Sequence, residues 1–338
     1  MDLRDWRTVK VTIGIKALNE AAHIEASVRS ALAAVAPLGG RVVLADSGSR
    51  DATTDIARPL DVRVVQLADP GDASCGAGAQ LAYQYAEGEY FCLIDGDMTL
   101  VPGFLEAGLA YLEVHPDVAG VGGEVIERNL STLEFQIRAA AVRDEAHRRE
   151  GLVDRLDGGG IYRMAAIRQV GYFSDRNLGS FEEFELAARL DAAGWKLARI
   201  DVPAIEHSGH SGSSYPLLLR RLTSGQLSGA GQVLRSALGR RQLPFVLTRL
   251  KHVRAAVTIW AWWCACVVCG VFAPLALPAL LLGPCAFLVW RRGSLRLGIF
   301  SFCQWNLVAV GIIAGLLRSR VPPDRPVPAV ELSPRSKP

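Results

Sequence analysis

Charged residues are missing from two long stretches of this 338-residue chain, residues 255–290 and residues 297–317. The first stretch is long enough for two short membrane helices, with a turn near Pro274 and Pro278, and the second matches one span of about 20 residues. A buried hairpin of a soluble domain is the alternative, but tryptophans toward the ends of these stretches are typical of membrane proteins. We therefore predict transmembrane helices at about residues 255–273, 275–290 and 297–317.

A large net charge is also missing, because 37 Lys and Arg are balanced by 34 Asp and Glu to give +3. This balance does not indicate nucleic-acid binding. The basic residues gather instead in residues 213–254, at Arg220, Arg221, Arg235, Arg240, Arg241, Arg249, Lys251 and Arg254. A solvated helix face is one interpretation; basic amphipathic helices beside a membrane, facing the cytoplasm and anionic lipid headgroups, are the other and the one we predict.

A secretory signal is not expected, because Met1 to Trp6 include acidic residues and no apolar core. We therefore expect the part before the apolar stretches in the cytosol and the protein in the inner (plasma) membrane as a multi-pass protein. At the other end, proline-rich residues 319–338 predict a disordered tail.

Disulfides are not expected from the seven cysteines. Five of them lie in the apolar stretches, at Cys264, Cys266, Cys269, Cys285 and Cys303. No second pair and no histidine accompanies Cys266 and Cys269 there, so small packing residues are a better interpretation than a zinc or redox site.

Strand-like runs alternate with helical segments in the first hundred residues. The runs cover residues 11–15, 41–45, 62–66 and 90–94. This alternation predicts an α/β sandwich with a largely parallel sheet, within a domain of residues 1–212. Ligands of such sheets gather at the carboxyl ends of the strands, where Asn19, Asp46 and Asp95 fall.

The pattern changes in the second half of this domain. We expect strands at residues 118–126 and 197–205, and helices at residues 133–150 and 182–193. Between them, Gly158, Gly159 and Gly160 form a loop that would let the backbone approach a substrate.

Two carboxylates, Asp95 and Asp97, follow the apolar run that ends at Ile94. Side chains two residues apart on an extended segment share a side, and neighbouring carboxylates repel unless a cation lies between them. Oxygen ligands select hard ions such as Mg²⁺ or Mn²⁺. A solvated turn is the alternative, because Asp-Gly-Asp is an ordinary turn composition.

Four sequence features in fixed order are more specific together than any one alone. They are the segments 15–20 (IKALNE), 46–53 (DSGSRDAT), 88–97 (GEYFCLIDGD) and 182–190 (EEFELAARL). Over roughly residues 9–210 this resembles glycosyltransferase family 2, the inverting nucleotide-sugar transferases of the GT-A fold. The resemblance implies a nucleotide-sugar donor and a divalent cation.

The resemblance also implies roles for single residues. Those beside the nucleotide donor would be Asn19, Glu20, Asp46, Ser47, Gly76 and Asp95. For Asn19 a helix N-cap, and for Asp46 a turn acid, are alternatives. Asp97 would be the more direct metal ligand and Asp95 would lie nearer the ribose or a metal-bound water. His207 would be a third ligand unless it is structural, with His210 as its competitor. Gly159 and Gly160 would lie on the acceptor side.

Inversion requires a base that takes the proton of the acceptor hydroxyl, on the face opposite the leaving diphosphate. The resemblance gives this role to the second acid at a helix start, here Glu183, where relatives have aspartate. Glu182 is the alternative base, although a carboxylate there also favours a helix N-terminus through the dipole. We interpret Arg189 as a structural ion-pair partner.

This sequence departs from the family pattern at Lys16, where proline is usual, and at Ala79 and Gln80, where Arg-Asn is common. The Gln-x-x-Arg-Trp motif of processive synthases is absent, which favours a single addition per binding event. We expect an inverting transferase acting on a lipid-linked acceptor in surface polysaccharide or glycolipid assembly. Polyprenyl phosphate is an alternative acceptor; a non-catalytic membrane scaffold and a nucleotidyltransferase are alternative functions.

Overall fold

The computed structural model describes residues 9–128, 133, 145–156, 158–209 and 214–333. The chain forms two compact units. The first comprises residues 1–129, 141–210 and 320–338, and the second comprises residues 130–140 and 211–319.

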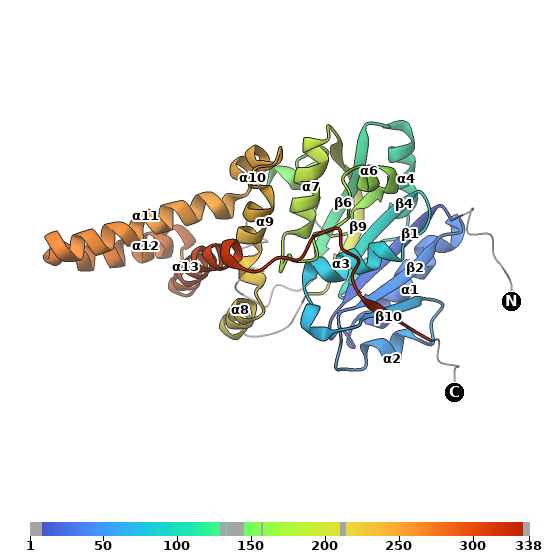
Figure 1. Ribbon diagram of the computed structural model, residues 1–338, viewed down its shortest axis with the longest axis horizontal. Helices are drawn as coiled ribbons and strands as arrows, with labels where there is room; N and C mark the ends of the chain where they lie inside the picture. The colour runs from blue at the N-terminus through green and yellow to red at the C-terminus, as the bar shows by residue number, and fades with distance from the viewer. Residues whose placement is uncertain (1–8, 129–132, 134–144, 157, 210–213, 334–338) are drawn as a thin grey trace. The chain divides into compact units, whose positions relative to one another are not determined.

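The first unit is built on a mixed ten-stranded sheet (Figure 1). Its strands are β1 (Val11–Ala17), β2 (Arg41–Asp46), β3 (Arg63–Leu67), β4 (Tyr90–Asp95), β5 (Met98–Leu100), β6 (Val118–Glu127), β7 (Gly151–Val153), β8 (Ile161–Arg163), β9 (Lys196–His207) and β10 (Ala329–Leu332). The strand order is β10-β3-β2-β1-β4-β8-β6-β9-β5, with β7 paired to β9. Strands β3, β2, β1 and β4 run parallel, which confirms the α/β prediction for the first hundred residues. Beyond β4 the pairing is mixed, because β8 is antiparallel to both its neighbours.

Helices in this unit follow the strands in the order expected of an α/β fold. They are α1 (Ile24–Val35), α2 (Thr53–Ala57), α3 (Cys75–Gln84), α4 (Phe104–Val114), α6 (Met164–Gln169) and α7 (Glu182–Ala192). In α1, Ile24, Val28, Ala31 and Val35 recur at helical spacing and are all buried.

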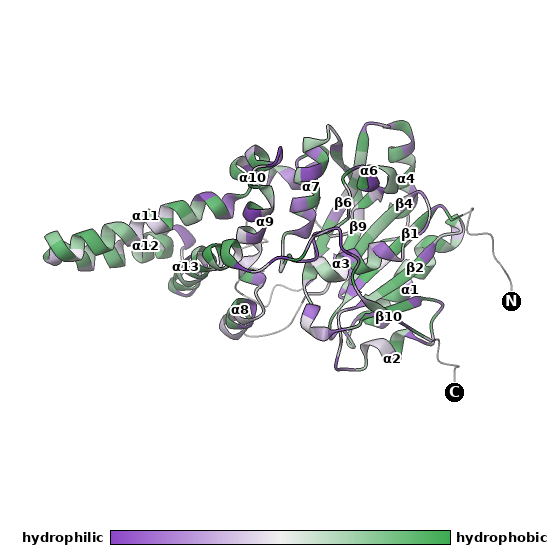
Figure 2. Cartoon of the chain, viewed as in Figure 1, coloured by the Kyte–Doolittle hydropathy of each residue, from purple (hydrophilic) through white to green (hydrophobic). Residues whose placement is uncertain are grey.

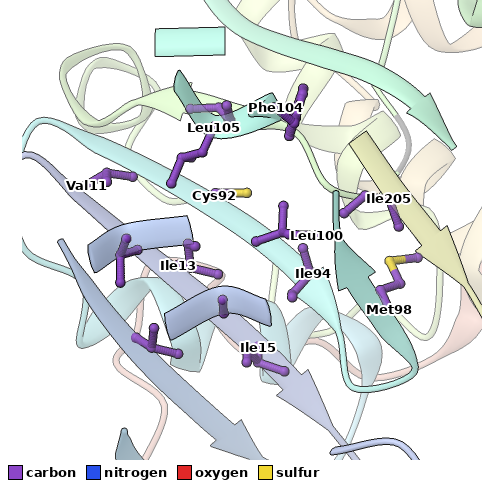
Figure 3. Packing of buried hydrophobic residues seen from close by; sticks show 14 of the residues in the cluster. Val11, Ile13, Ile15, Cys92, Ile94, Met98, Leu100, Phe104, Leu105 and Ile205 are labelled. Carbon is purple, nitrogen blue, oxygen red and sulfur yellow. The ribbon is translucent and has the colours of Figure 1, made fainter. Parts of the chain in front are cut away.

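The main core lies where these helices cover the sheet. Figure 3 shows side chains of this core, among them Ile13 and Ile15 of β1 and Ile94 of β4. Ile13, Ile15 and Ile94 are fully buried. Since alternate residues of a strand point to the same face, the period of two along β1 and β4 fixes which side meets the helices.

The helix expected at residues 133–150 lies mostly outside the described residues. Its described end is not α-helical: Ala146–Arg148 form a 3₁₀ turn, and Gly151–Val153 form strand β7.

The expectation of a disordered C-terminal tail is wrong for the described residues after Ser319. Strand β10 pairs antiparallel with β3 and so covers the edge of the sheet. Gln84 donates a side-chain hydrogen bond to the carbonyl of Val327 (3.1 Å) and accepts one from its N–H (2.9 Å). Val327 is 1% exposed. Proline did not exclude order here, because the strand bonds lie in residues 329–332, which contain no proline and fall between Pro328 and Pro334.

The second unit is helical. Its elements are α8 (Ser214–Thr223), η6 (Gln226–Ser228), α9 (Gly229–Ala237), α10 (Leu243–Arg249), α11 (Lys251–Phe272), η7 (Pro274–Ala276), α12 (Leu277–Arg292) and α13 (Leu295–Leu317). Among the residues that the structure describes, three helices are long and apolar enough to cross a membrane: Lys251–Phe272, Pro274–Arg292 and Leu295–Leu317. Figure 2 shows the hydrophobic character of α11 and α12 along their length.

The pairing of β10 with β3 can be tested by a charge swap. Arg63 donates two hydrogen bonds to Glu331, at 3.1 and 2.9 Å. We expect Glu331→Arg to loosen the tail by like-charge repulsion and to raise hydrogen exchange of the β10 amides. Adding Arg63→Glu should restore protection, with a coupling of about 0.5–1 kcal/mol. Equal exchange in the single and double variants would contradict this pairing.

Candidate functional site

Three of the expected donor-site residues come together at one edge of the sheet. In the register of β2, β1 and β4, Ala17 lies opposite Asp46 and Lys16 lies opposite Asp95. Asn19 follows β1 by two residues. These side chains therefore meet at the carboxyl ends of neighbouring parallel strands, as predicted.

Asp46 is fully buried, and its two oxygens differ. One accepts hydrogen bonds from the N–H groups of Gly48 (3.0 Å) and Ser49 (2.9 Å) and from the Gln66 amide (2.8 Å). The other, Oδ1, is buried without a hydrogen-bond partner in the part of the chain that the structure describes. A buried acceptor without a donor is costly, so this oxygen is suited to a ligand N–H.

Asn19 organises the loop beside Asp46. Its φ is 59°, a left-handed conformation that asparagine tolerates. Its side-chain oxygen accepts from the Arg50 N–H (2.8 Å), and its own N–H donates to the Ser49 hydroxyl (2.8 Å). The N-cap of α1 is His23, so the N-cap interpretation of Asn19 is wrong. Ser47 is also buried, and its N–H donates to the Ala17 carbonyl (2.9 Å).

The second cluster combines Asp97, His207 and Glu127. His207 Nε2 lies 3.3 Å from Asp97 Oδ2, and its Nδ1 lies 2.6 Å from Glu127 Oε2. Burial lowers the pKa of His207, but the hydrogen bonds and charges of the two carboxylates outweigh this and raise it to about 10. Glu127 was missed in the sequence, although it directly follows the strand predicted at residues 118–126.

Glu20 lies beside this cluster and is 8% exposed. Burial raises its pKa, and the charges of Asp97 and Asp95 add to the effect, giving about 8. A Cβ on Gly96 would lie 2.8 Å from Glu20 Cγ. The glycine between the two aspartates therefore makes room for Glu20.

Lys16, the departure from proline, connects three elements. Its ammonium lies 3.2 Å from Asp95 Oδ1 and donates to Glu182, so β1, β4 and α7 meet at one cation. Burial alone would lower the pKa of Lys16, but the charges of Asp95 and Glu182 raise it well above its usual range. Burial raises the pKa of Asp95, with Lys16 opposing. For Glu182, Lys16 outweighs burial and lowers the pKa.

The two adjacent glutamates at the start of α7 therefore differ. Glu182 is 8% exposed and bound to Lys16, whereas Glu183 is partly exposed. Burial raises the pKa of the Cys92 thiol to about 12, and the charge of Glu183 contributes, which places this carboxylate within electrostatic reach of β4. Phe181, which precedes them, has φ 66°, an uncommon left-handed conformation for an aromatic residue.

Arg189 has a structural environment. It lies 2.9 Å from Glu185 Oε2 in a buried ion pair. It also donates to the carbonyls of Tyr172 (2.6 Å) and Phe173 (2.9 Å). Gln80, a departure from the family pattern, accepts hydrogen bonds from the N–H groups of Phe173 and Ser174 (3.0 and 2.9 Å). Both side chains hold the segment before α7 in place.

The three glycines expected at the ligand site have packing neighbours in the protein itself. A Cβ on Gly76 would clash with the carbonyl of Asp175, and one on Gly159 would clash with Ile205. A Cβ on Gly160 would lie 2.9 Å from the Tyr162 ring. Internal packing thus explains why glycine is needed at these positions.

A divalent cation would find a carboxylate oxygen and an imidazole nitrogen at Asp97 and His207. No group of three His, Cys, Asp or Glu side chains with the arrangement of a metal site occurs among the residues whose placement is described. The donor pair fits Mn²⁺ or Mg²⁺ when the ligand itself supplies oxygens. His210, the competitor of His207, lies outside the described residues.

Comparisons with known proteins agree with this geometry. Residues 12–171 match the model of "Glycosyl transferase family 2". The succinoglycan biosynthesis protein ExoA of Rhizobium meliloti (strain 1021) is 26% identical over 289 residues, covering 78% of this chain and 85% of that protein.

A solved structure has the same fold over most of the chain. It is the mannosyltransferase PcManGT from Pyrobaculum calidifontis in complex with GDP-Man and Mn²⁺, with a TM-score of 0.65 and 16% identity over 91% of this chain and 87% of that one. The GT-A prediction for the α/β unit is thereby confirmed, with three long apolar helices following it. The sequence match over residues 12–171 therefore places this part of the chain in glycosyltransferase family 2.

Proposed function

We propose that this glycosyltransferase moves a sugar, with inversion, from a nucleoside-diphosphate donor to a lipid-linked acceptor at the cytoplasmic face of the membrane. The observation that carries the proposal is the placement of Asp46, Asp95 and Asp97 at one end of the parallel strands. Asp95 is paired with Lys16, and Asp97 lies beside His207. The similarity to ExoA, a succinoglycan biosynthesis protein, supports surface polysaccharide assembly as the setting.

Asp46 would bind the nucleobase. Its Oδ1 can accept an N–H, and its other oxygen is held by three donors that fix the carboxylate. Asn19 would keep the loop of residues 47–50 closed around the base through its two hydrogen bonds. Ser47 and Glu20 would complete the donor side.

Asp97 and His207 would hold the divalent cation. When bound, the ion supplies Lewis-acid neutralisation of the charge that develops on the leaving diphosphate. Binding requires a neutral imidazole nitrogen, so a proton must leave His207. Asp95, already paired with Lys16, would act nearer the ribose than the ion.

Glu183 would be the base. Its neighbour Glu182 is bound to the Lys16 ammonium, and a carboxylate with a lowered pKa is a poorer proton acceptor. Glu183 would take the proton of the acceptor hydroxyl as that oxygen forms a bond to the anomeric carbon and the bond to the nucleoside diphosphate breaks.

The base assignment is tested by two matched variants. Glu183→Gln should lower kcat by roughly 10²–10⁴-fold with donor KM nearly unchanged, because only proton transfer is lost. Glu182→Gln should instead lower the melting temperature, since Lys16 loses the buried one of its two carboxylate partners. A full rate for Glu183→Gln, with turnover lost in a folded Glu182→Gln protein, would assign the base to Glu182.

The nucleobase contact is tested by Asp46→Asn. In this variant the amide oxygen keeps the hydrogen bonds from Gly48, Ser49 and Gln66 only when it occupies the position of Oδ2. The NH₂ group then occupies the position of Oδ1, so a donor replaces the acceptor that would bind the nucleobase. We expect donor KM to rise about 10–100-fold, the loss of a hydrogen bond to a charged group, with a smaller change in kcat. The exposed Asp61→Asn is the control, and an unchanged KM for the Asp46 variant would exclude the contact.

The metal site is tested by Asp97→Asn in a titration with Mn²⁺. Loss of several kcal/mol of charge neutralisation predicts a rate at least ~100-fold lower and a weaker response to Mn²⁺. Asp117→Asn, an aspartate on the protein surface paired with Lys196, should behave as the wild type. Unchanged metal dependence of nucleoside diphosphate release in the Asp97 variant would remove Asp97 from the site.

A further inference from the structure

The C-terminal segment after α13 returns to the catalytic unit. Arg320 lies 2.6 Å from Asp175 Oδ2, and the N–H of Val321 donates to Asn177 Oδ1 (2.8 Å). Further along, Arg176 donates to the carbonyl of Pro326 (2.8 Å) before β10 joins the sheet. The chain is thus bound to the catalytic unit within four residues of Leu317, the last residue of α13.

This connection is too short to cross a bilayer. Four extended residues reach about 14 Å, whereas the hydrocarbon core is about 30 Å thick. The C-terminal end of α13 must therefore lie on the same side of the membrane as the catalytic unit, in a chain anchored as proposed above.

The start of α11 lies on that side as well. In the described residues between 214 and 250, the longest helix is α8 with 10 residues, about 15 Å long. Such a helix does not span the core. The chain consequently enters α11 and leaves α13 on one side, which requires an even number of crossings among the three apolar helices.

Charge distinguishes the ways in which two helices could cross. Arg291, Arg292 and Arg296 lie at the junction of α12 and α13. This junction is cytoplasmic only if α11 and α12 are the crossing pair; if α13 crosses with either, it faces the other side. The positive-inside tendency therefore favours an α11–α12 hairpin, whose turn at residues 273–276 has no charge. Arg318 and Arg320 then face the cytoplasm too.

The packing of α13 agrees with this assignment. Of the 18 most apolar consecutive residues of α13, 39% are buried inside the protein. The same share is 6% for α11 and 0% for Pro274–Arg292. A Cβ on Gly231 of α9 would clash with the carbonyl of Ile312, and one on Gly315 with the carbonyl of Ser228. The C-terminal half of α13 thus lies in backbone contact with the short helices that precede α11.

Tryptophans connect α13 to the middle of α11. Trp260 donates to the Ala309 carbonyl (3.3 Å), and Trp263 donates to Asn306 Oδ1 (2.9 Å). His252 lies beside Trp305, with ring centroids 5.5 Å apart. The middle of α13 thereby meets the middle of α11 through the two tryptophans and the start of α11 through His252.

We propose that α11 and α12 cross the membrane and return as a hairpin, while α13 stays at the cytoplasmic face and is held there by residues 320–333. The side chains of α13 that α9 and α11 leave exposed, among them Val310 and Ile313, would lie among acyl chains of the cytoplasmic leaflet. This inference rests on the membrane association in the proposed function, and it replaces the three spans predicted from hydropathy.

Epitope insertion in the full-length chain tests the proposal. Tags are placed after Gly39 as a cytoplasmic reference, after Leu275, after Gly293 and after Pro338. Antibody access is compared between right-side-out spheroplasts and inside-out vesicles. We expect the Leu275 tag to be reached only from outside and the other three only from the cytoplasmic side. A Pro338 tag reached from outside would show that α13 crosses, and a Leu275 tag reached from inside would exclude the hairpin.

The untagged chain gives an independent measurement. Trypsin added outside spheroplasts should leave Arg318, Arg320 and Arg325 uncut, as read by the mass of the C-terminal fragment. Cleavage there in intact cells would overturn the proposal even if a tagged protein failed to fold. Metal-dependent turnover of the donor, measured in the same vesicles, distinguishes a failure of the proposed function from a failure of the proposed topology. The expected pattern of antibody access without such turnover would contradict the function and leave the topology unaffected.

Discussion

A partly buried cation between two carboxylates is the constraint on which the site depends. Lys16 brings a positive charge to the end of β1, where the half-exposed Asp95 and the buried Glu182 would otherwise leave two negative charges without compensation. Removing charges from water is costly unless they are paired, so β1, β4 and α7 are held at one spacing by this contact. A substitution that appears in the sequence as a departure from proline is therefore integrated into the site.

That cation separates the acidic residues into two groups. Asp95 and Glu182 are compensated by Lys16, whereas Asp97, in the turn before β5, forms a cluster with His207 of β9 and Glu127 of β6. The carboxylates of Asp95 and Asp97 are two residues apart in sequence but have different electrostatic surroundings. The same logic separates Glu182 from Glu183, and it explains how one short helix start can supply both a structural acid and a proposed base.

The C-terminal segment has a role in the fold as well as in the proposed membrane arrangement. Strand β10 covers the edge of β3 and supplies the pairing that an open edge lacks. Because the chain reaches this edge directly after α13, a sheet contact in one unit restricts the path of helices in the other through covalent connectivity alone. Hydropathy depends only on the length and polarity of each helix, so it cannot predict on which side of the membrane the end of α13 must lie.

The sequence alone determined the strand–helix order, the positions of Asn19, Asp46, Asp95 and Asp97 at strand ends, and the three apolar helices, because these follow from local periodicity and composition. Only the tertiary structure decided that Lys16 binds Glu182, that Glu127 joins His207, and that the proline-rich end forms β10. Each of these contacts joins residues 80 or more positions apart. Sheet register and chain return set such pairs, and no local pattern encodes them.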